Sequence, residues 1–286
     1  MINKKTHGFD INLPIEINHN RCVNMIHNNI YKILYSSQIR HNKVLEAMEY
    51  MLLGGGKMLR PFFFLAINSI FTEKISKFAL NIATSIEMIH TYSIIHDDLP
   101  VMDNDDYRRG KPTCHKKFGE GTAVLAGNGL LTLAFELLSK QEKDINNQSR
   151  IIYEISKLIG HEGLILGQSM DLNITDKSYD SKELIKSKIL KTANLFIACS
   201  KASAIINDLS KKEEDKLSLF AEQFGIAYQV KDDIEDGEDK KKHSSAQLIS
   251  SALKQGLSHL EYFYPKAILI TNLAQYCFKL YLPIPI

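Results

Sequence analysis

The chain has 286 residues, of which 44% are hydrophobic and 24% are charged, and its formal net charge at pH 7 is +2. This length can bury one large core or two small ones, and the composition is typical of a soluble globular protein. The small net charge argues neither for nor against nucleic acid, and no other feature leads us to expect it as a partner.

Cysteine spacing and hydrophobic runs exclude further classes of protein. Cys22, Cys114, Cys199 and Cys277 show no metal-ligand spacing and no dense disulfide framework, so we expect reduced thiols in a cytoplasmic protein. The polar segment 1–14 lacks the apolar region of a signal peptide. The sequence contains no run of 18 apolar residues, so we predict no membrane span.

Apolar residues recur with a period of roughly 3.6 in almost every segment, which predicts helices. Glycine and proline are sparse and fall between these segments, and strand-like alternation is scarce. Ser210, with Glu213 three residues later, predicts a capping box at a helix start. We therefore expect one all-α domain of many helices. In chain order, the predicted helical segments are 20–53, 61–70, 76–96, 122–139, 148–171, 181–208 and 211–233.

The first acidic cluster, Asp97, Asp98 and Asp103, directly follows the predicted helix 76–96. Pro100 disfavours helical backbone at the preceding residue, so we expect the helix to end with Asp97 and Asp98 on its last turn. Carboxylates are unfavourable at the negative end of a helix unless a cation joins them. An acidic, solvated turn is the alternative explanation.

The second acidic cluster, Asp232, Asp233 and Asp236, closes the last predicted helix. Asp232 and Asp236 share one helix face, where like charges repel, so a partner such as Lys231 or a metal ion is expected. An exposed acidic helix end is the alternative. Mg²⁺ favours a few carboxylates together with water and substrate phosphates, so the two clusters together predict a site for Mg²⁺ and a polyphosphate.

Basic residues lie on both sides of the first acidic cluster. Arg108 and Arg109 follow it, while the glycine run 54–56 with Lys57 and Arg60 precedes it. Glycine lets the backbone approach a ligand closely, and arginine suits bidentate recognition of phosphate. The run does not match a Walker motif, and a turn that connects two helices is the alternative.

In combination, these motifs resemble the trans-polyprenyl diphosphate synthases, and within them most closely the bacterial farnesyl diphosphate synthases (geranyltranstransferases). The resemblance covers roughly residues 20–236. The matching motifs are Asp97-Asp98-x4-Asp103 with Arg108-Arg109-Gly110, Gly55-Gly56-Lys57-x-x-Arg60-Pro61, Glu87 to Ser93, Leu125-Ala126-Gly127, Gly163-x3-Gly167-Gln168-x2-Asp171, Lys191-Thr192, Phe224-Gly225-x2-Tyr228-Gln229 and Asp232-Asp233-x2-Asp236.

The resemblance implies a single isoprenoid-synthase-type helical domain over 1–286 around a deep central cavity, usually in a homodimer. Segment 1–19 is expected to be flexible and 237–286 to be divergent and shortened. Two or three Mg²⁺ ions per active site are implied. Their implied ligands are Asp97, Asp103 and Asp232, with Asp98 and Asp236 as further candidates. Asp233 and Lys191 join these aspartates as candidate catalytic residues.

The resemblance also assigns two diphosphate sites and a reaction. An allylic diphosphate, dimethylallyl or geranyl, ionises with Mg²⁺, the double bond of isopentenyl diphosphate attacks the cation, and a proton is lost to give farnesyl diphosphate. The implied contacts of the allylic diphosphate are Arg108, Lys191 and Thr192, with Gln229 nearby. Those of isopentenyl diphosphate are Lys57, Arg60, His90 and Arg109. A satisfied core histidine is the alternative for His90.

Tyr92, five residues before Asp97, resembles a floor that stops the growing chain at C15, although an ordinary core position is the alternative. A C20 (geranylgeranyl) synthase or a decayed, non-catalytic partner subunit are the alternative functions. A terpene cyclase is disfavoured because it needs no second diphosphate pocket. After Asp236 the family's lysine-bearing loop is shortened, and one of Lys240, Lys241 and Lys242 would have to replace its lysine.

Overall fold

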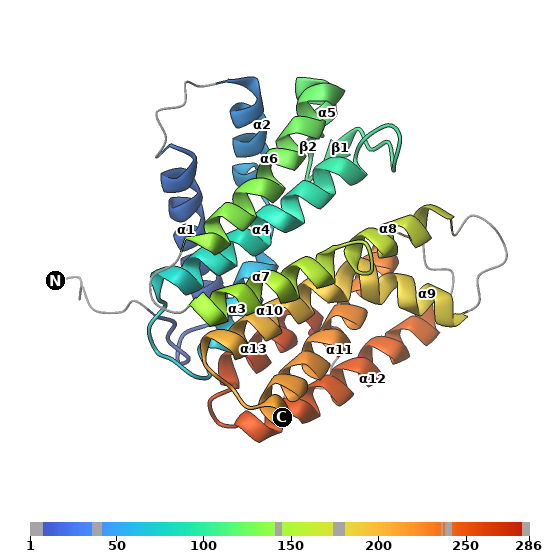
Figure 1. Ribbon diagram of the computed structural model, residues 1–286. Coiled ribbons are helices and arrows are strands. Elements are labelled where there is room, and N and C mark those ends of the chain that lie inside the picture. Colours follow the sequence, from blue (N-terminus) through green and yellow to red (C-terminus); the bar gives the residue numbers. More distant parts are fainter. Residues whose placement is uncertain are drawn as a thin grey trace. The chain divides into compact units, whose positions relative to one another are not determined.

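The computed structural model describes residues 8–35, 42–140, 145–173, 181–235, 237 and 242–281 (Figure 1). Helices dominate these residues, so the predicted all-α class is confirmed. The chain forms two compact units. Among the described residues, unit 1 comprises those up to Asn18, those of Phe63–Ile75 and those from Ser149 onward. Unit 2 comprises His19–Phe62 and Ser76–Gln148.

The helices and strands are short to medium in length, and the single sheet in the described residues is a hairpin of two two-residue strands. The elements are α1 (Ile15–Leu34), α2 (Lys43–Leu53), α3 (Leu59–Asn68), α4 (Lys77–Asp97), β1 (Tyr107–Arg108), β2 (Lys111–Pro112), α5 (Cys114–Phe118), α6 (Glu120–Ser139), α7 (Ile145–Ile159), α8 (Leu164–Asn173), α9 (Ser181–Lys188), the π-helical η1 (Ile189–Ala193), α10 (Asn194–Ile206), α11 (Lys211–Glu235), α12 (Lys242–Leu260), the 3₁₀ turn η2 (Glu261–Phe263) and α13 (Ile268–Phe278).

The predicted segments 76–96, 122–139 and 211–233 correspond to α4, α6 and α11 within two residues at each end. Segment 20–53 instead overlaps two helices, α1 and α2, and segment 148–171 overlaps α7 and α8. Periodicity continues across these breaks, so it does not reveal them. The hairpin was not predicted either, because its strands are too short to alternate. Arg109 (φ 55°) and Gly110 (φ 74°) form its turn, and two positive φ angles are typical of a type I′ turn.

Unit 2 is built on α4 and α6, which pack against each other, with α2 beside both (Figure 1). Apolar residues of α4 such as Ile82, Ile86 and Ile89 are fully buried. The Ser85 hydroxyl donates to the Ala134 carbonyl oxygen on α6 at 3.0 Å, so a buried polar group is satisfied within this contact. The packing holds the end of α4, where the first acidic cluster begins.

The core of unit 1 contains a group of phenylalanine rings from α3, α10, α11 and α13. The Phe63 ring lies 4.7 Å from that of Phe224 and 5.0 Å from that of Phe196, and Phe224 lies 5.2 Å from Phe278. Such pairs add about 0.5–1.5 kcal/mol each beyond their burial. These ring contacts hold α10 and α11 together. α10 directly follows η1 in the chain, and α11 packs against η1.

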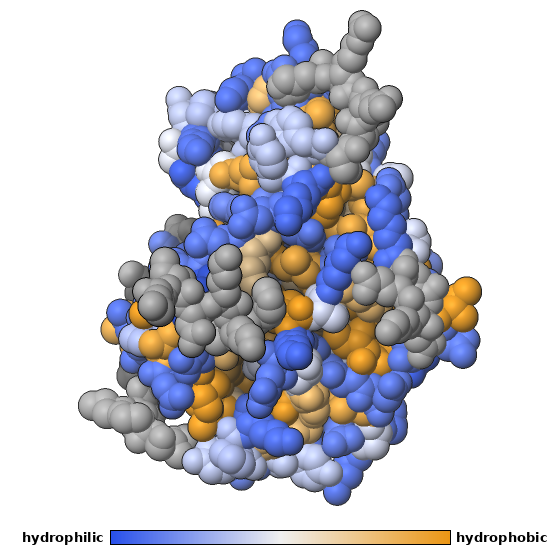
Figure 2. All heavy atoms as spheres, turned by 90° about the vertical axis from the view of Figure 1, so that its left-hand side faces the viewer, coloured by the Kyte–Doolittle hydropathy of each residue, from blue (hydrophilic) through white to orange (hydrophobic). Residues whose placement is uncertain are grey.

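Some apolar surface remains exposed. Figure 2 shows several apolar patches on one face of the molecule, each bordered by hydrophilic residues. Two helical stretches, Glu120–Ser139 and Ile185–Ile206, are long and apolar enough to cross a membrane by length and composition. In the second, 72% of the most apolar window is buried inside the protein, as in a core helix. Core helices pass this test too, so the predicted lack of a membrane span stays a prediction.

Candidate active site

The first acidic cluster lies where the chain turns back after α4. The helix ends at Asp97, as Pro100 predicted. The backbone N–H of Asp103 donates to the carbonyl oxygen of Asp97 at 2.9 Å, and Asn104 (φ 54°) donates to Leu99 at 3.1 Å. The turn therefore places Asp103 beside Asp97, although six residues separate them in the sequence.

Asp98 is in a different environment from Asp97 and Asp103. Its side chain is fully buried, and Oδ1 accepts from Arg108 Nε at 3.0 Å and from Nη2 at 2.6 Å. Arg108 Nη2 also donates to Asp105 Oδ2 at 2.6 Å. Burial raises the pKa of the Asp98 carboxyl, and the Arg108 guanidinium partly opposes that shift. Asp98 thus orients Arg108, while its predicted role as a metal ligand stays a prediction.

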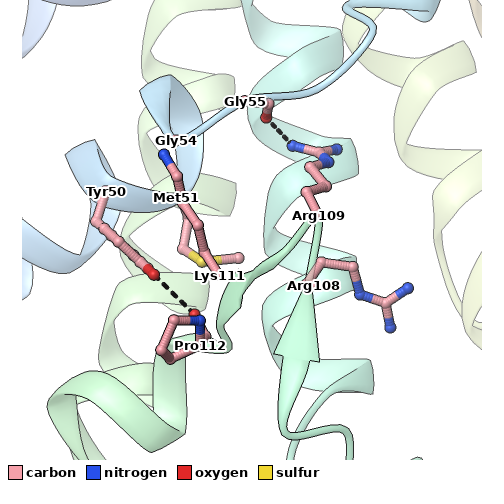
Figure 3. A pocket seen from close by; sticks show the side chains of 8 residues that line it. All are labelled: Tyr50, Met51, Gly54, Gly55, Arg108, Arg109, Lys111 and Pro112. Carbon is pink, nitrogen blue, oxygen red and sulfur yellow. Dashed lines mark hydrogen bonds between the residues drawn. The ribbon is translucent and has the colours of Figure 1, made fainter.

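The glycine run connects α2 and α3 and holds Arg109. Gly55 (φ 116°) and Gly56 (φ 139°) adopt backbone conformations that other residues rarely reach. Arg109 donates to the Gly55 carbonyl oxygen, and a Cβ on Gly56 would lie 2.7 Å from Arg109 Cζ. In Figure 3, Arg109 points to Gly55, whereas Arg108 points away from the small pocket of about 20 Å³ beside them. The Gly55 carbonyl oxygen therefore binds the Arg109 guanidinium, and the missing side chain of Gly56 leaves space for it.

Arg60 and His90 are paired in unit 2. Arg60 Nη1 lies 2.9 Å from His90 Nε2. Arginine can only donate, so Nε2 accepts, and a neutral His90 carries its proton on Nδ1. Burial and the positive charges of Arg60, Arg109 and Arg108 lower the pKa of His90 well below its ordinary value. His90 is therefore neutral with its proton on Nδ1, and its predicted role at a diphosphate stays a prediction.

Glu87 is a residue of this group that sequence reasoning missed. It lies one turn before His90 on α4 and is 2% exposed. Burial raises the pKa of its carboxyl, and the charges of Arg60 and Arg109 oppose that shift. Its spacing of three residues from His90, on one helix face, was the available signal. Glu87 is therefore a buried carboxyl group in the electrostatic field of these two arginines.

Lys57 is held through its backbone. The Lys57 carbonyl oxygen is hydrogen-bonded to His19 Nε2, and the His19 ring stacks on Phe62 with centroids 5.3 Å apart. Lys57 lies in unit 2, which also contains the predicted site residues Arg60, His90, Tyr92, Asp97, Asp98, Asp103, Arg108 and Arg109.

In unit 1, Lys191 and Thr192 lie on the π-helical turn η1. A Cβ on Gly167 of α8 would lie 2.8 Å from Lys191 Cα, and one on Gly225 of α11 would lie 2.5 Å from Ala193 Cα. Both glycines therefore let a neighbouring helix touch the backbone of η1. Single π-helical turns are frequent at functional sites, and here the turn presents both predicted phosphate-binding residues.

Hydrogen bonds join the second acidic cluster to η1. Asp233 Oδ1 accepts from Gln229 Nε2 at 2.8 Å, and Gln229 Oε1 accepts from the Thr192 hydroxyl. Asp233 Oδ2 is paired with Lys188, and Lys191 is paired with Asp171. Sequence reasoning gave Lys188 no role, because nothing local links it to a residue 45 positions away.

Several predicted residues lie at the edge of the described structure. Asp232 is on the last turns of α11, whereas Asp236, Lys240 and Lys241 lie outside the described residues. Lys242 begins α12, but its side chain is not among those described. Within the described ranges, no three His, Cys, Asp or Glu side chains are grouped to hold a metal ion. Mg²⁺ needs only one or two carboxylates when water and phosphates complete its shell, so Asp97 and Asp103 fit it.

Tyr92 is buried on α4, with 7% of its surface exposed. Burial and the charge of Asp97 raise the pKa of its hydroxyl. Its ring meets the edge of the His96 ring, with centroids 5.7 Å apart and planes at 86°. Tyr92 thus lies close to Asp97 on the same helix, as the sequence predicted, and its role in chain length remains to be tested.

Known proteins with similar sequences are named as synthases of prenyl diphosphates. A model of the polyprenyl synthetase family matches residues 41–248, more than half of the chain. Farnesyl diphosphate synthase of Bacillus subtilis (strain 168) is 42% identical over 194 residues, which cover 67% of this chain and 65% of that protein. The chloroplastic geranylgeranyl pyrophosphate synthase of Catharanthus roseus is 40% identical over 245 residues, covering 83% and 66%. The chain therefore spans about two thirds of the length of these relatives.

A solved structure agrees with the fold. The apo structure of an FPP/GFPP synthase from Zymomonas mobilis superposes with a TM-score of 0.86 and 32% sequence identity, covering 92% of this chain and 98% of that chain. This match extends beyond the segments that carry the motifs, and it confirms the predicted fold class.

Proposed function

Because the chain belongs to the polyprenyl synthetase family, we propose that it is a prenyltransferase that joins an allylic diphosphate to isopentenyl diphosphate. The observation that carries this proposal is that unit 2 contains both a cationic group and an acidic turn. It contains a cationic group, Arg60, neutral His90 and Arg109 around a glycine turn, together with an acidic turn at Asp97 and Asp103. A protein that handles one free diphosphate and one metal-bound diphosphate needs both kinds of site.

In this proposal Lys57, Arg60, His90 and Arg109 bind the diphosphate of isopentenyl diphosphate. His90 donates through Nδ1 while its Nε2 accepts from Arg60, so both ring nitrogens are used. Arg109 supplies a planar donor group suited to phosphate, at a place that its glycine neighbours define. The buried carboxyl group of Glu87 lies in the electrostatic field of Arg60 and Arg109 and belongs to the same group.

The allylic diphosphate is bound by Arg108, Lys191 and Thr192 and by metal ions. Asp97 and Asp103 in unit 2 and Asp232 in unit 1 are the proposed Mg²⁺ ligands, with Asp98, Asp233 and Asp236 as further candidates, and two or three ions are expected. When bound, Mg²⁺ supplies positive charge that stabilises the departing diphosphate. Arg108, oriented by Asp98, adds a second stabilising charge, and Gln229 orients Thr192.

Bond formation needs little from the protein once the allylic group has ionised. The double bond of isopentenyl diphosphate attacks the allylic cation, and the released diphosphate accepts the proton that is lost. No protein base is required. Apolar side chains such as Tyr92 exclude the water that would otherwise trap the cation.

We further propose farnesyl diphosphate, the C15 compound, as the product, with buried Tyr92 as the floor that limits the chain. A C20 product is the alternative. We also expect a homodimer in the cytoplasm. Sedimentation analysis of the purified chain tests the dimer, which a monomer at micromolar concentration would contradict.

The deciding experiment incubates the purified full chain with geranyl diphosphate, isopentenyl diphosphate and Mg²⁺ and identifies the prenyl products by length. A C15 product supports both the activity and the floor. A C20 or longer product keeps the activity and rejects the floor. Folded protein that forms no product would reject the proposed activity.

One observation favours a second candidate, a partner subunit without activity of its own. Lys188 already occupies one oxygen of Asp233 in the second acidic cluster. Calorimetric titration of the protein with Mg²⁺ and inorganic diphosphate tests this, with Lys188→Met as the variant. Lys201→Met, which loses ion pairs to Glu154 and Glu214, is the matched control. A partner subunit would bind Mg²⁺ and diphosphate weakly unless Lys188 is removed. An active enzyme would already bind them tightly in its wild-type form.

A further inference from the structure

His96, the residue before Asp97, makes three contacts within unit 2. Its Nε2 lies 3.2 Å from the carbonyl oxygen of Val124 on α6. Its ring meets the Tyr92 ring edge to face, with centroids 5.7 Å apart. It also lies against Gly127 of α6, where a Cβ would be 2.5 Å from His96 Cδ2 and 3.0 Å from Cε1. One side chain thus joins α6 to the residue proposed to limit the product.

These contacts fix the state and the orientation of the imidazole. A carbonyl oxygen can only accept, so His96 Nε2 carries a proton and donates it to Val124. The absence of a side chain at Gly127 is what lets the ring lie on α6, because any Cβ there would overlap it. The ring therefore has a hydrogen bond at one edge, a helix backbone on one side and Tyr92 on another. These three contacts favour one orientation of the half-buried ring.

The orientation of His96 in turn limits Tyr92. The two residues are four apart on α4 and share one helix face, so their rings must pack around each other. Edge-to-face aromatic contacts have a preferred geometry, and Tyr92 is 7% exposed, so little space is available on its other sides. Removal of His96 would open space beside Tyr92 and let the phenol ring turn aside.

We propose that His96, held by Gly127 and Val124, is a positioning residue that sets the orientation of Tyr92 and thereby the length of the prenyl product. This inference rests on the proposed prenyltransferase function. It assigns His96 no contact with substrate or metal. Its effect is on the ratio of longer to shorter products, which a residue needed only for folding would leave unchanged.

The test compares product lengths for His96→Ala, Gly127→Ala, the double variant and Gly121→Ala. Gly121 is the matched control, because it lies on α6 and a Cβ there meets nothing within 4 Å. His96→Ala removes the ring, whereas Gly127→Ala keeps it but displaces it. We expect both to raise the ratio of C20 to C15 product by about two- to tenfold, the range that an aromatic contact is worth. The double variant should match His96→Ala, since both changes break one contact.

A second measurement does not depend on turnover. Nitrogen-15 spectra of the histidine side chains report which ring nitrogen carries the proton. We expect His96 to be protonated on Nε2 in the wild type and its signal to move in Gly127→Ala but not in Gly121→Ala. Thermal unfolding shows which variants fold.

The outcomes separate the two proposals. Unchanged product ratios in folded His96→Ala and Gly127→Ala would overturn the positioning role while leaving the prenyltransferase proposal intact. A His96 signal typical of a freely rotating, solvent-exposed ring would overturn it as well. Wild-type protein that forms no prenyl product, with the His96 signal as expected, would overturn the proposed function and with it the effect on product length.

Discussion

At the scale of single residues, the chemistry of the candidate site depends on which partner each charged group has. Arg108 is committed to Asp98 and Asp105, and Arg109 to the Gly55 carbonyl oxygen, although the two arginines are adjacent in the sequence. The turn between β1 and β2 directs them differently (Figure 3). Two adjacent arginines therefore have different partners, and the proposed function assigns them to two different diphosphates.

Gly56→Ala should weaken isopentenyl diphosphate binding, because the new Cβ collides with the Arg109 guanidinium. Gly55→Ala is the control. It has the same positive-φ strain, of order 1–3 kcal/mol, but meets no atom within 4 Å. We expect the KM for isopentenyl diphosphate to rise about tenfold or more in Gly56→Ala and little in Gly55→Ala. Equal KM values in the two variants would show that Arg109 needs no glycine at this place.

His90 should make stability depend on pH. Its pKa in the folded protein is well below the ordinary value of 6.5. The folded state then binds fewer protons than the unfolded state, so the contribution of His90 to stability is lost as pH falls below 6.5. Urea unfolding at about pH 7.5 and about pH 5.5 measures this. The urea midpoint should fall more on acidification in the wild type than in His90→Gln, which cannot titrate. The same fall in both proteins would contradict it.

At the scale of elements, glycines decide where helices touch. Gly167 and Gly225 bring α8 and α11 against η1, and Gly127 brings α6 against His96 of α4. The helix ends follow simpler local rules. Ser210 and Glu213 form the predicted capping box, with the Ser210 N–H donating to Glu213 Oε2 at 2.9 Å. Caps could be predicted because both partners are close in sequence, whereas the glycine contacts could not.

Gly225→Ala should destabilise unit 1 although alanine is the better helix former. Its Cβ would lie 2.5 Å from Ala193 Cα, which is backbone and cannot move aside cheaply. Overpacking of this kind costs typically about 1–3 kcal/mol, more than the roughly 1 kcal/mol gained from helix propensity. Urea unfolding measures the change, and Gly121→Ala, which meets nothing, should be neutral or stabilising. A stabilised Gly225→Ala would show that α11 and η1 are not in close contact.

At the scale of the whole molecule, the predicted site residues divide between the two units. Unit 2 contains Lys57, Arg60, His90, Arg109 and the first acidic cluster, and unit 1 contains η1 and Asp232 and Asp233 of the second acidic cluster. Neither unit alone has both complete sets of residues.

Asp103→Asn in unit 2 and Asp232→Asn in unit 1 should therefore each lower kcat strongly, by about 100-fold or more, because each removes charge that stabilises the departing diphosphate. The double variant should be less impaired than the product of the two effects, as is typical of residues that act together. Asp215→Asn, an exposed aspartate paired with Lys211, is the control. Wild-type kcat in either single variant would mean that its acidic cluster takes no part in catalysis.

Much of this could be predicted from the sequence, for reasons that are local. Helical periodicity, the end of α4 before Pro100, the capping box at Ser210 and the type of each motif residue all depend on neighbours within a few positions. Family resemblance added roles to residues, and the all-α fold class that it implied is confirmed. The roles themselves stay predictions that the variants above would test.

Only the tertiary structure decided which distant groups meet. Sequence alone could not show that the buried Asp98 carboxylate accepts hydrogen bonds from Arg108, or that Lys188 pairs with Asp233. It also could not show that Glu87 is buried near the charges of two arginines. A charged residue has the same intrinsic chemistry at any position, and its partner is chosen by packing between elements far apart in the chain. The same reason explains His96 and Gly127, whose contact depends on how closely two helices approach.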